Sequence, residues 1–403
     1  MGKQKRLMLL GGLRYLLPVI EEAHKLGVYV ITADYLPHNI AHKYSDEYCN
    51  VSIIDKEAVL KAAQELQIDG ILSHAVDPGV VSAAYVAEKM KLPFQCSYEV
   101  ACILQDKSKF RKFLQENGFN CPHAKGYESI DEALKDVEYF EWPVIVKPVD
   151  SAGSKGVTKV EEKEDLNKAI ETALASSISK RFIIEDFLEK EGYSVGSESF
   201  VIDGKLMYNA FYDQYFDDES INPYTPSAEI WPSLMSDKYQ NEIKSELQRL
   251  IDLLGITTGL FNVECRVCKN GKAYLMEVSP RAGGNRLAEM LNYAADVNIN
   301  QAETYKALGL PIGNMHEPNY KGHFAILVLH ADKEGIYDGI VIDENFRKNH
   351  VVEEEVRIKI GDQVSGFTGA NAAIGTLFLK FESREELAKA LTNQKKWLHI
   401  GLK

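Results

Sequence analysis

The first hundred residues alternate between short apolar runs and amphipathic segments. Apolar runs of strand length and composition cover residues 6–10, 28–33 and 70–73. Each run is followed by a stretch with apolar residues at helical spacing, which predicts helices over residues 15–26, 56–66 and 79–90. Strands that alternate with helices form a parallel sheet covered on both faces. The pattern therefore predicts an N-terminal α/β domain with a doubly wound parallel sheet over residues 1–98.

The pattern changes after residue 99. Helices are predicted at 107–116, 165–175 and 237–254, strands at 143–147 and 181–185 and from Cys121-Pro122, and hairpins at Asp203-Gly204 and Asn270-Gly271. Beyond residue 312, short strands return at 323–329, 354–360 and 372–381, followed by a helix at 384–391. Because one hydrophobic core rarely grows beyond about 300 residues, we expect further domains over 99–311 and 312–403, the last an α+β extension.

Charge and composition exclude several classes of protein. The net charge of −13 argues against a partner such as nucleic acid or an anionic membrane, which needs a basic surface. No apolar stretch reaches the roughly 20 residues of a membrane span, and the apolar N-terminal run breaks at Gly11-Gly12, as a strand would. Cys265 and Cys268 lie in a predicted strand, where residues three apart face opposite ways. We therefore expect a cytoplasmic protein with reduced cysteines.

Two glutamates in the second hairpin carry the clearest chemical signal. A turn centred on Asn270-Gly271 places Glu264 opposite Glu277. The same register places Asn262 opposite Ser279, on the same face. Like charges opposed on neighbouring strands destabilise a sheet unless a cation lies between them. Mg²⁺ prefers such oxygen ligands and completes its shell with water and phosphate. The alternative is a pair of solvated carboxylates on an exposed face.

Several cationic residues lie near turns that suit an anion. Lys147 ends an apolar strand, so its ammonium needs an anionic partner, either phosphate or a structural acid. The small-residue loop at 150–156 follows directly, and its amides can approach a phosphate closely. Lys107 lies in the first turn of a predicted helix, where a cation opposes the dipole. Arg281 follows the acidic hairpin, where it can stabilise charge on a transferring phosphoryl group.

Other candidate residues keep two interpretations at this stage. Arg286, in the Gly-Gly-Asn-Arg segment that opens the next helix, either contacts a substrate carboxylate or pairs with a neighbouring acid. Glu185 ends an apolar strand, and either reads the amino edge of adenine or terminates the strand. Asp77 follows a strand at the carboxyl edge, where parallel sheets bind ligands, although loop capping is its commoner role. The stretch 208–224, rich in aromatics and acids, is either a lid or an exposed loop.

The order of these motifs resembles the ATP-grasp superfamily. The resemblance is carried by Asp106-Lys107, the strand ending in Lys147, the small-residue loop, Glu185-Asp-Phe-Leu188, Asn262-Val-Glu264 and Met276-Glu-Val-Ser-Pro-Arg281. It covers nearly the whole chain and is nearest to amino-acid ligases and other carboxylate–amine ligases. It implies a central ATP-grasp fold with a nucleotide lobe over about 107–188 and a catalytic lobe over about 189–311.

The resemblance also implies ATP and Mg²⁺ as cofactors, with Mn²⁺ as an alternative ion. The implied nucleotide contacts are Lys107, Lys147, Ser151, Ser154, Lys155, Gly156, Glu185, Phe187 and Leu188. The implied metal ligands are Glu264, Glu277 and Ser279, where the family usually has Asn in place of Ser279. Arg281 and Lys147 would be catalytic, and Arg281, Gly284 and Arg286 would contact the substrate. Glu198 is a weak candidate for the ribose contact.

The implied reaction joins a small-molecule carboxylate to an amine. ATP phosphorylates the carboxylate, and the amine then attacks the acyl phosphate with release of ADP and phosphate; positioning and electrostatics supply the catalysis. The alternatives are a bicarbonate-activating enzyme of the carbamoyl-phosphate-synthase or carboxylase kind, and a catalytically silent ATP-binding regulator. The oligomeric state is not fixed by the sequence, although homodimers are common among proteins that resemble this chain.

Overall fold

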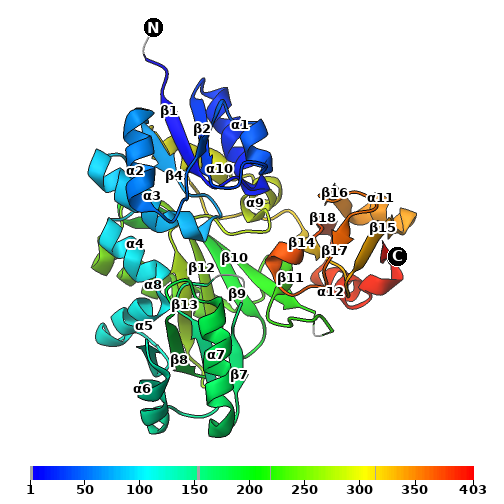
Figure 1. Cartoon of the computed structure of the whole chain (residues 1–403). Helices are drawn as coiled ribbons and strands as arrows, with labels where there is room; N and C mark the ends of the chain where they lie inside the picture. Colours follow the sequence, from blue (N-terminus) through cyan, green and yellow to red (C-terminus); the bar gives the residue numbers. More distant parts are fainter. Residues whose placement is uncertain (1–2, 152–154, 218, 314) are drawn as a thin grey trace.

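The N-terminal domain contains the expected parallel sheet. A computed structural model describes residues 3–151, 155–217, 219–313 and 315–403. The strands are β1 (Arg6–Leu10), β2 (Tyr29–Asp34), β3 (Glu47–Asn50) and β4 (Gly70–Leu72), in the order β3-β2-β1-β4. Helices α2 (Lys56–Glu65) and α3 (Asp77–Met90) pack on one face and α1 (Leu17–Lys25) on the other (Figure 1). Only β3 escapes the sequence pattern, because Glu-Tyr-Cys-Asn is short and only half-buried.

The region predicted to be the nucleotide lobe is built on a four-stranded antiparallel sheet. Its strands β5 (Ala124–Tyr127), β6 (Val144–Pro148), β7 (Thr158–Val160) and β8 (Phe182–Asp186) have the order β5-β8-β6-β7. The helices of this region are α4 (Tyr98–Gln105), α5 (Lys107–Glu116), α6 (Ile130–Lys135) and α7 (Leu166–Ser176). Strand β5 begins later than the Cys121-Pro122 start expected from sequence. Lys147 and Glu185 lie on the adjacent antiparallel strands β6 and β8, which brings two predicted site residues to neighbouring positions.

An eight-stranded sheet joins the catalytic lobe to the C-terminal part. Its order is β13-β12-β9-β10-β11-β14-β18-β16. The strands are β9 (Ser194–Ile202), β10 (Lys205–Phe216), β11 (Pro226–Trp231), β12 (Gly259–Val267), β13 (Ala273–Ser279), β14 (His323–Leu329), β16 (Val351–Val356) and β18 (Gly375–Phe381). Helix α8 (Asp237–Leu254) packs on one face, and α9 (Leu287–Ala295) and α10 (Ile299–Ala307) on the other. The domain boundaries near residues 98 and 311 stay predictions, since this sheet continues past residue 312.

The remaining C-terminal elements surround the end of that sheet. They are β15 (Gly335–Ile342), α11 (Glu344–His350), β17 (Gln363–Val364), α12 (Arg384–Thr392) and β19 (Leu398–Leu402). The strand expected at 354–360 is wrong at both ends: it runs over Val351–Val356, because it continues directly from α11 and the following residues turn at Gly361. Within the described ranges, no helix has the length and apolar character needed to cross a membrane.

Candidate active site

The acidic pair predicted from the second hairpin is confirmed in the structure. Glu264 on β12 lies opposite Glu277 on β13, and Asn262 lies opposite Ser279. Opposed residues of an antiparallel pair point to the same face of the sheet. The two carboxylates therefore share one side of the hairpin, as a shared cation requires.

The two strands reach this register through two irregularities that the sequence pattern did not predict. Of the two predicted turn residues only Gly271 has a positive φ, +74°, and its amide donates to the Cys268 carbonyl at 2.8 Å. This is a three-residue loop with a glycine bulge, so the pairs next to it are one residue out of the expected register, as Cys265 opposite Leu275 shows. A second irregularity, between Glu264 and Cys265, restores the expected register. Two offsets of one residue thus cancel before the acidic pair.

The electrostatics of the pair suit a bound cation. Desolvation and the facing Glu277 carboxylate raise the pKa of Glu264. The Lys107 ammonium lies 3.2 Å from a Glu277 oxygen and donates to the Ser151 carbonyl at 3.0 Å. Burial lowers the pKa of Lys107, but the nearby acids Glu277, Asp77 and Glu264 together outweigh that effect and raise it. Two facing carboxylates beside the Lys107 ammonium fit a divalent ion.

A second cluster lies where β6, β8 and α5 meet. Glu185 is buried; one of its oxygens contacts the Lys147 ammonium, and the other accepts from Arg111 Nε at 2.9 Å. Arg111 also donates to the Met276 carbonyl on β13 at 2.8 Å. Burial raises the pKa of Glu185, but the two cations outweigh it and lower that pKa to about 2. The structure therefore shows the salt-bridge alternative for Lys147, and Glu185 holds two cations.

Arg281 is held by an acid from the N-terminal domain. Its guanidinium makes a two-pronged contact with Asp77, at 2.7 and 2.8 Å, and donates to the Asn262 amide oxygen at 3.2 Å. The Ser279 hydroxyl donates to the same Asp77 at 2.9 Å and accepts from Gln105 at 2.5 Å. Asp77, the first residue of α3, therefore also binds Arg281 and Ser279. Ser279 is buried, and among the described residues its hydroxyl donates one hydrogen bond and accepts one, which leaves one lone pair of the oxygen free. Its role as a metal ligand stays a prediction.

Two further acids lie buried on the same face of the sheet, and no cation among the described residues is in contact with either. Glu198 accepts from the Asn262 amide at 2.7 Å and from the Gly283 backbone at 3.0 Å. Glu229 accepts from the Asn285 amide at 2.7 Å. The second oxygen of each has no hydrogen-bond partner among the described residues. Burial raises both pKa values to about 8, so each carboxyl is mainly protonated at neutral pH.

The other predicted site residues are distributed around these clusters. Ser154 lies outside the described residues, while Lys155 and Gly156 continue the loop into β7. Phe187 donates its backbone amide to Pro143 at 3.0 Å, and the Leu188 carbonyl accepts from Arg266 at 3.3 Å. Arg286 pairs with neighbouring acids, the second of its two interpretations. The roles of these residues toward adenine, phosphate and substrate stay predictions.

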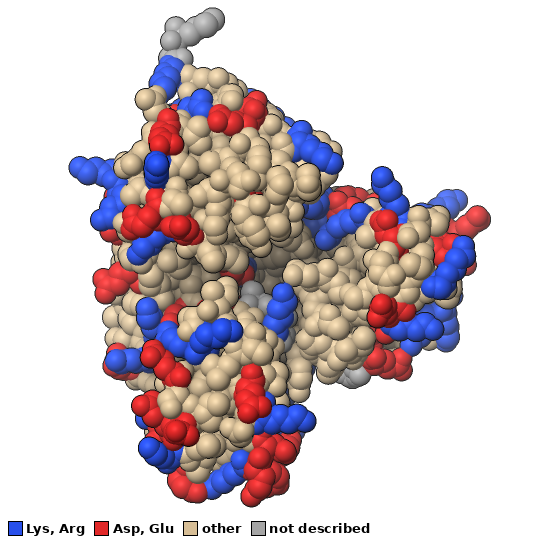
Figure 2. Space-filling view, viewed as in Figure 1, with Lys and Arg blue, Asp and Glu red and all other residues tan. Residues whose placement is uncertain are grey.

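Sequence reasoning missed Arg111, Gln105 and Glu229. Arg111 could have been found, because it lies four residues after Lys107 on the face of α5 that also buries Leu114. Gln105 ends α4 and Glu229 lies inside an apolar strand. Nothing in the local sequence distinguishes Gln105 from a surface residue. Glu229 could have been found, because an acid inside an apolar strand needs a partner. Figure 2 shows the molecular surface hollowed between the N-terminal domain, the nucleotide lobe and the C-terminal part, with the eight-stranded sheet behind it.

Comparison with known proteins assigns the chain to a class. The ATP-grasp domain family matches residues 140–289. This segment contains Lys147, Glu185, the acidic hairpin and Arg281, so the resemblance seen in the motif order is confirmed for this part of the chain, which matches the class of ATP-grasp domains. ATP with Mg²⁺ is the cofactor set of that class, and a biotin carboxylase domain with this fold has been solved with MgADP.

Solved structures similar to this chain show its fold but leave its activity open. The L-amino acid ligase of Bacillus licheniformis is 21% identical with a TM-score of 0.81, and the phosphoribosylglycinamide synthetase of Anaerococcus prevotii is 21% identical with a TM-score of 0.77. Both comparisons cover 100% of each chain, and at this identity they show a shared fold. This fold confirms the predicted fold class.

Curated sequence relatives include carbamoyl phosphate synthase large chains. That of Thermotoga neapolitana is 29% identical over 46% of this chain, and that of Helicobacter pylori is 29% identical over 62%. The chain spans only 17% and 23% of the length of these two relatives. They therefore support the class of domain, and the activity of this chain is inferred separately.

Proposed function

We propose that the protein is an ATP-dependent carboxylate–amine ligase that acts through an acyl phosphate. The observation that carries this proposal is the acidic pair Glu264 and Glu277, which shares one region with Lys107 and Arg281. Pairs of acids with nearby cations are what a magnesium–triphosphate complex needs from a protein. The substrates are a small-molecule carboxylate and an amine, with an amino acid as the first candidate, since an L-amino acid ligase shares the fold.

The chain's own residues account for the expected steps by position and charge. A carboxylate oxygen of the substrate attacks the γ-phosphorus of ATP and the bond to ADP breaks. Lys107 and Lys147 would neutralise the phosphates, and Mg²⁺, held by Glu264 and Glu277, would supply further charge neutralisation. Arg281 would stabilise the transferring phosphoryl group. The amine then attacks the acyl carbon, loses a proton and displaces phosphate.

Arg281 would have to exchange partners for this role. In the structure Asp77 occupies the guanidinium fork of Arg281. Burial raises the pKa of Asp77, but Arg281, with Ser279 and Lys107, outweighs that effect and lowers it. A phosphoryl or carboxylate oxygen can replace one prong of such a contact, because the guanidinium offers five donors. Asp77 would then keep the Arg281 guanidinium in position through the remaining contact.

The test is a turnover assay on the purified chain. Mg-ATP is incubated with an equimolar pool of the twenty proteinogenic amino acids, and ADP, AMP and phosphate are quantified. The proposal expects ADP with phosphate, amino-acid dependence, and a hydroxamate when hydroxylamine traps the acyl phosphate. Formation of AMP with pyrophosphate would contradict the mechanism.

A second candidate follows from the curated relatives. Their names describe carbamoyl phosphate synthase, an activity that suggests bicarbonate as the activated acid. Under this reading, ADP release depends on bicarbonate and is unaffected by the amino-acid pool. The same assay in carbonate-depleted buffer, with and without added bicarbonate, separates the two. A silent ATP-binding regulator would bind Mg-ATP without turnover in either arm.

A further inference from the structure

The segment Gly283–Arg286, between β13 and α9, has an unusual backbone. Asn285 and Arg286 both have positive φ, +50° and +69°, a conformation that costs a non-glycine residue about 1–3 kcal/mol unless its surroundings impose it. Gly283 has no room for a Cβ, which would lie 2.3 Å from Leu287 and 2.7 Å from a Glu198 oxygen. Gly284 instead faces open space, and among the described residues its backbone amide has no acceptor. We call this segment the substrate loop.

Side-chain contacts hold the substrate loop at each end. At its start the backbone amide of Gly283 donates to the Glu198 carboxyl group. In its middle the side-chain amide of Asn285 donates to Glu229. At its end Arg286 is buried, with 1% of its side chain exposed. A strained backbone that is fixed from several sides persists because the anchors outweigh its cost.

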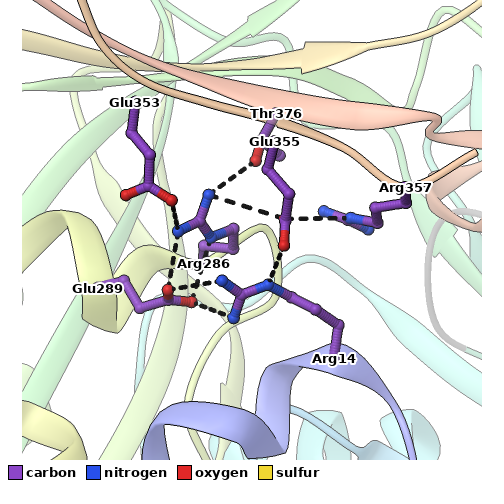
Figure 3. A network of polar contacts seen from close by, with 7 residues as sticks. All are labelled: Arg14, Arg286, Glu289, Glu353, Glu355, Arg357 and Thr376. Carbon is purple, nitrogen blue, oxygen red and sulfur yellow. Dashed lines mark hydrogen bonds and ion pairs between the residues drawn. The ribbon is translucent and has the colours of Figure 1, made fainter. Parts of the chain in front are cut away.

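The anchor at Arg286 comes largely from outside the catalytic lobe. Its guanidinium pairs with Glu289 at 2.8 Å and with Glu353, and donates to Thr376 at 3.2 Å (Figure 3). Its guanidinium carbon lies 4.3 Å from the centre of the Phe378 ring. Glu353 belongs to β16, and Thr376 and Phe378 to β18, more than 60 residues further along the chain.

The N-terminal domain completes the same network. Arg14 makes a two-pronged contact with Glu289, at 2.8 and 2.9 Å, and a third contact with Glu355 of β16 at 2.6 Å. Arg357 lies 3.3 Å from Glu355. The network thus contains three arginines and three glutamates, so its charge balances (Figure 3). Three parts of the chain meet around one arginine side chain, and that side chain ends the substrate loop.

We propose that Arg286 is a positioning residue, through which Glu353 and β16 set the shape of the substrate loop. This inference rests on the proposed function, since it takes the loop to face the amino-acid substrate. The network includes Glu289 of α9, and among the described residues its ion pairs reach neither the acidic pair nor the cluster of Lys147 and Glu185. A substitution in the network should therefore change the KM for the amino acid and leave the KM for Mg-ATP unchanged.

The first test measures the loop itself and needs no substrate. Hydrogen exchange on the full-length protein follows the amides of Gly283, Leu287 and Met290, which donate to Glu198, Gly284 and Arg286. Arg286→Met should speed their exchange at least 10-fold. Glu353→Gln, which leaves Glu289 and Thr376 in place, should speed it about 3-fold. Glu354→Gln is the matched control, because Glu354 lies on the same strand and pairs with Arg347 near the surface.

The second test uses turnover with the amino-acid pool. Glu353→Gln should raise the KM for the pool about 5-fold, with the KM for Mg-ATP within 2-fold of the wild type. Arg286→Lys keeps the charge but not the planar fork, so it should fall between Arg286→Met and the wild type. Unchanged loop exchange in both Arg286→Met and Glu353→Gln would overturn the proposal, as would equal increases in both KM values. A wild-type chain that turns over no amino acid contradicts the proposed function, while the exchange experiment still decides whether Arg286 holds the loop.

Discussion

The nucleotide lobe and the catalytic lobe each bury a glutamate, with opposite results. Glu185 and Glu198 are 3% and 0% exposed. Burial raises the pKa of both, but Arg111 and Lys147 outweigh it at Glu185 and lower that pKa to about 2. Within the part of the chain that the structure describes, Glu198 accepts hydrogen bonds only from neutral amides, and burial raises its pKa to about 8. Contact with a cation, rather than depth, decides which acid is charged.

The difference gives the two regions different chemistry. Around Glu185 two cations share one carboxylate, which leaves a net positive charge that suits a phosphate. Around Glu198 and Glu229 the acids are mainly protonated at neutral pH and can donate a hydrogen bond from their unpartnered oxygens. The first region is suited to anions, and the second to neutral acceptors near the substrate loop.

The largest effect is expected when the charged cluster loses a cation. Arg111→Met leaves Glu185 with Lys147 alone and removes the bond to the Met276 carbonyl, so the free energy of unfolding should fall by about 3–5 kcal/mol. Urea unfolding at pH 7 measures it. Glu198→Gln, which removes no charge pair, is the comparison and should not be destabilised. A loss below about 1 kcal/mol at Arg111 would falsify the contrast between the regions.

The next effect concerns the acidic pair. Glu277→Gln should reduce turnover at least about 100-fold, equivalent to about 2.7 kcal/mol of barrier, because one carboxylate for the cation is lost. The free energy of unfolding should stay within about 1 kcal/mol, since the repulsion with Glu264 is relieved while Lys107 loses a partner. The turnover assay and urea unfolding measure these effects. Lys269→Gln, at the exposed hairpin turn, is the control, and wild-type turnover in Glu277→Gln means that the cation binds elsewhere.

A smaller effect is expected from the pH dependence of stability. The pKa of Glu198 is about 8 in the folded chain against an ordinary 4.5, so the folded state keeps a proton that the unfolded state loses. Its contribution is fully present below pH 4.5 and is lost as the pH rises through 8. From pH 5 to 8 the wild type should lose about 1–3 kcal/mol relative to Glu198→Gln. Urea unfolding of both proteins at several pH values tests this, and parallel profiles contradict a neutral Glu198.

The smallest effect is expected at the edge of the arginine network. Glu354, on β16, forms an ion pair with Arg347 near the surface. Glu354→Gln removes this pair and should change the free energy of unfolding by less than about 0.5 kcal/mol. Glu353→Gln, one position earlier and in contact with buried Arg286, should cost more. Equal losses of unfolding free energy in the two variants would mean that the contact with buried Arg286 adds no stability.

The sequence predicted most elements because their apolar spacing is regular. Helices α5 and α8 and strands β1 and β14 have the expected bounds. The acidic pair was also predicted correctly, but the expected two-residue turn was wrong, and a second irregularity restored the register. Local patterns cannot show such compensation, because a bulge depends on how the neighbouring strands pack.

The sequence by itself determined the class of domain that the chain resembles, the alternation of its elements and the pairing of Glu264 with Glu277. Those features are local, since spacing and turn residues act over a few positions. Only the tertiary structure decided which charges meet: Arg111 with Glu185, Asp77 with Arg281, and Glu353 with Arg286. These partners are between 67 and 204 residues apart, and folding alone brings them within hydrogen-bond distance.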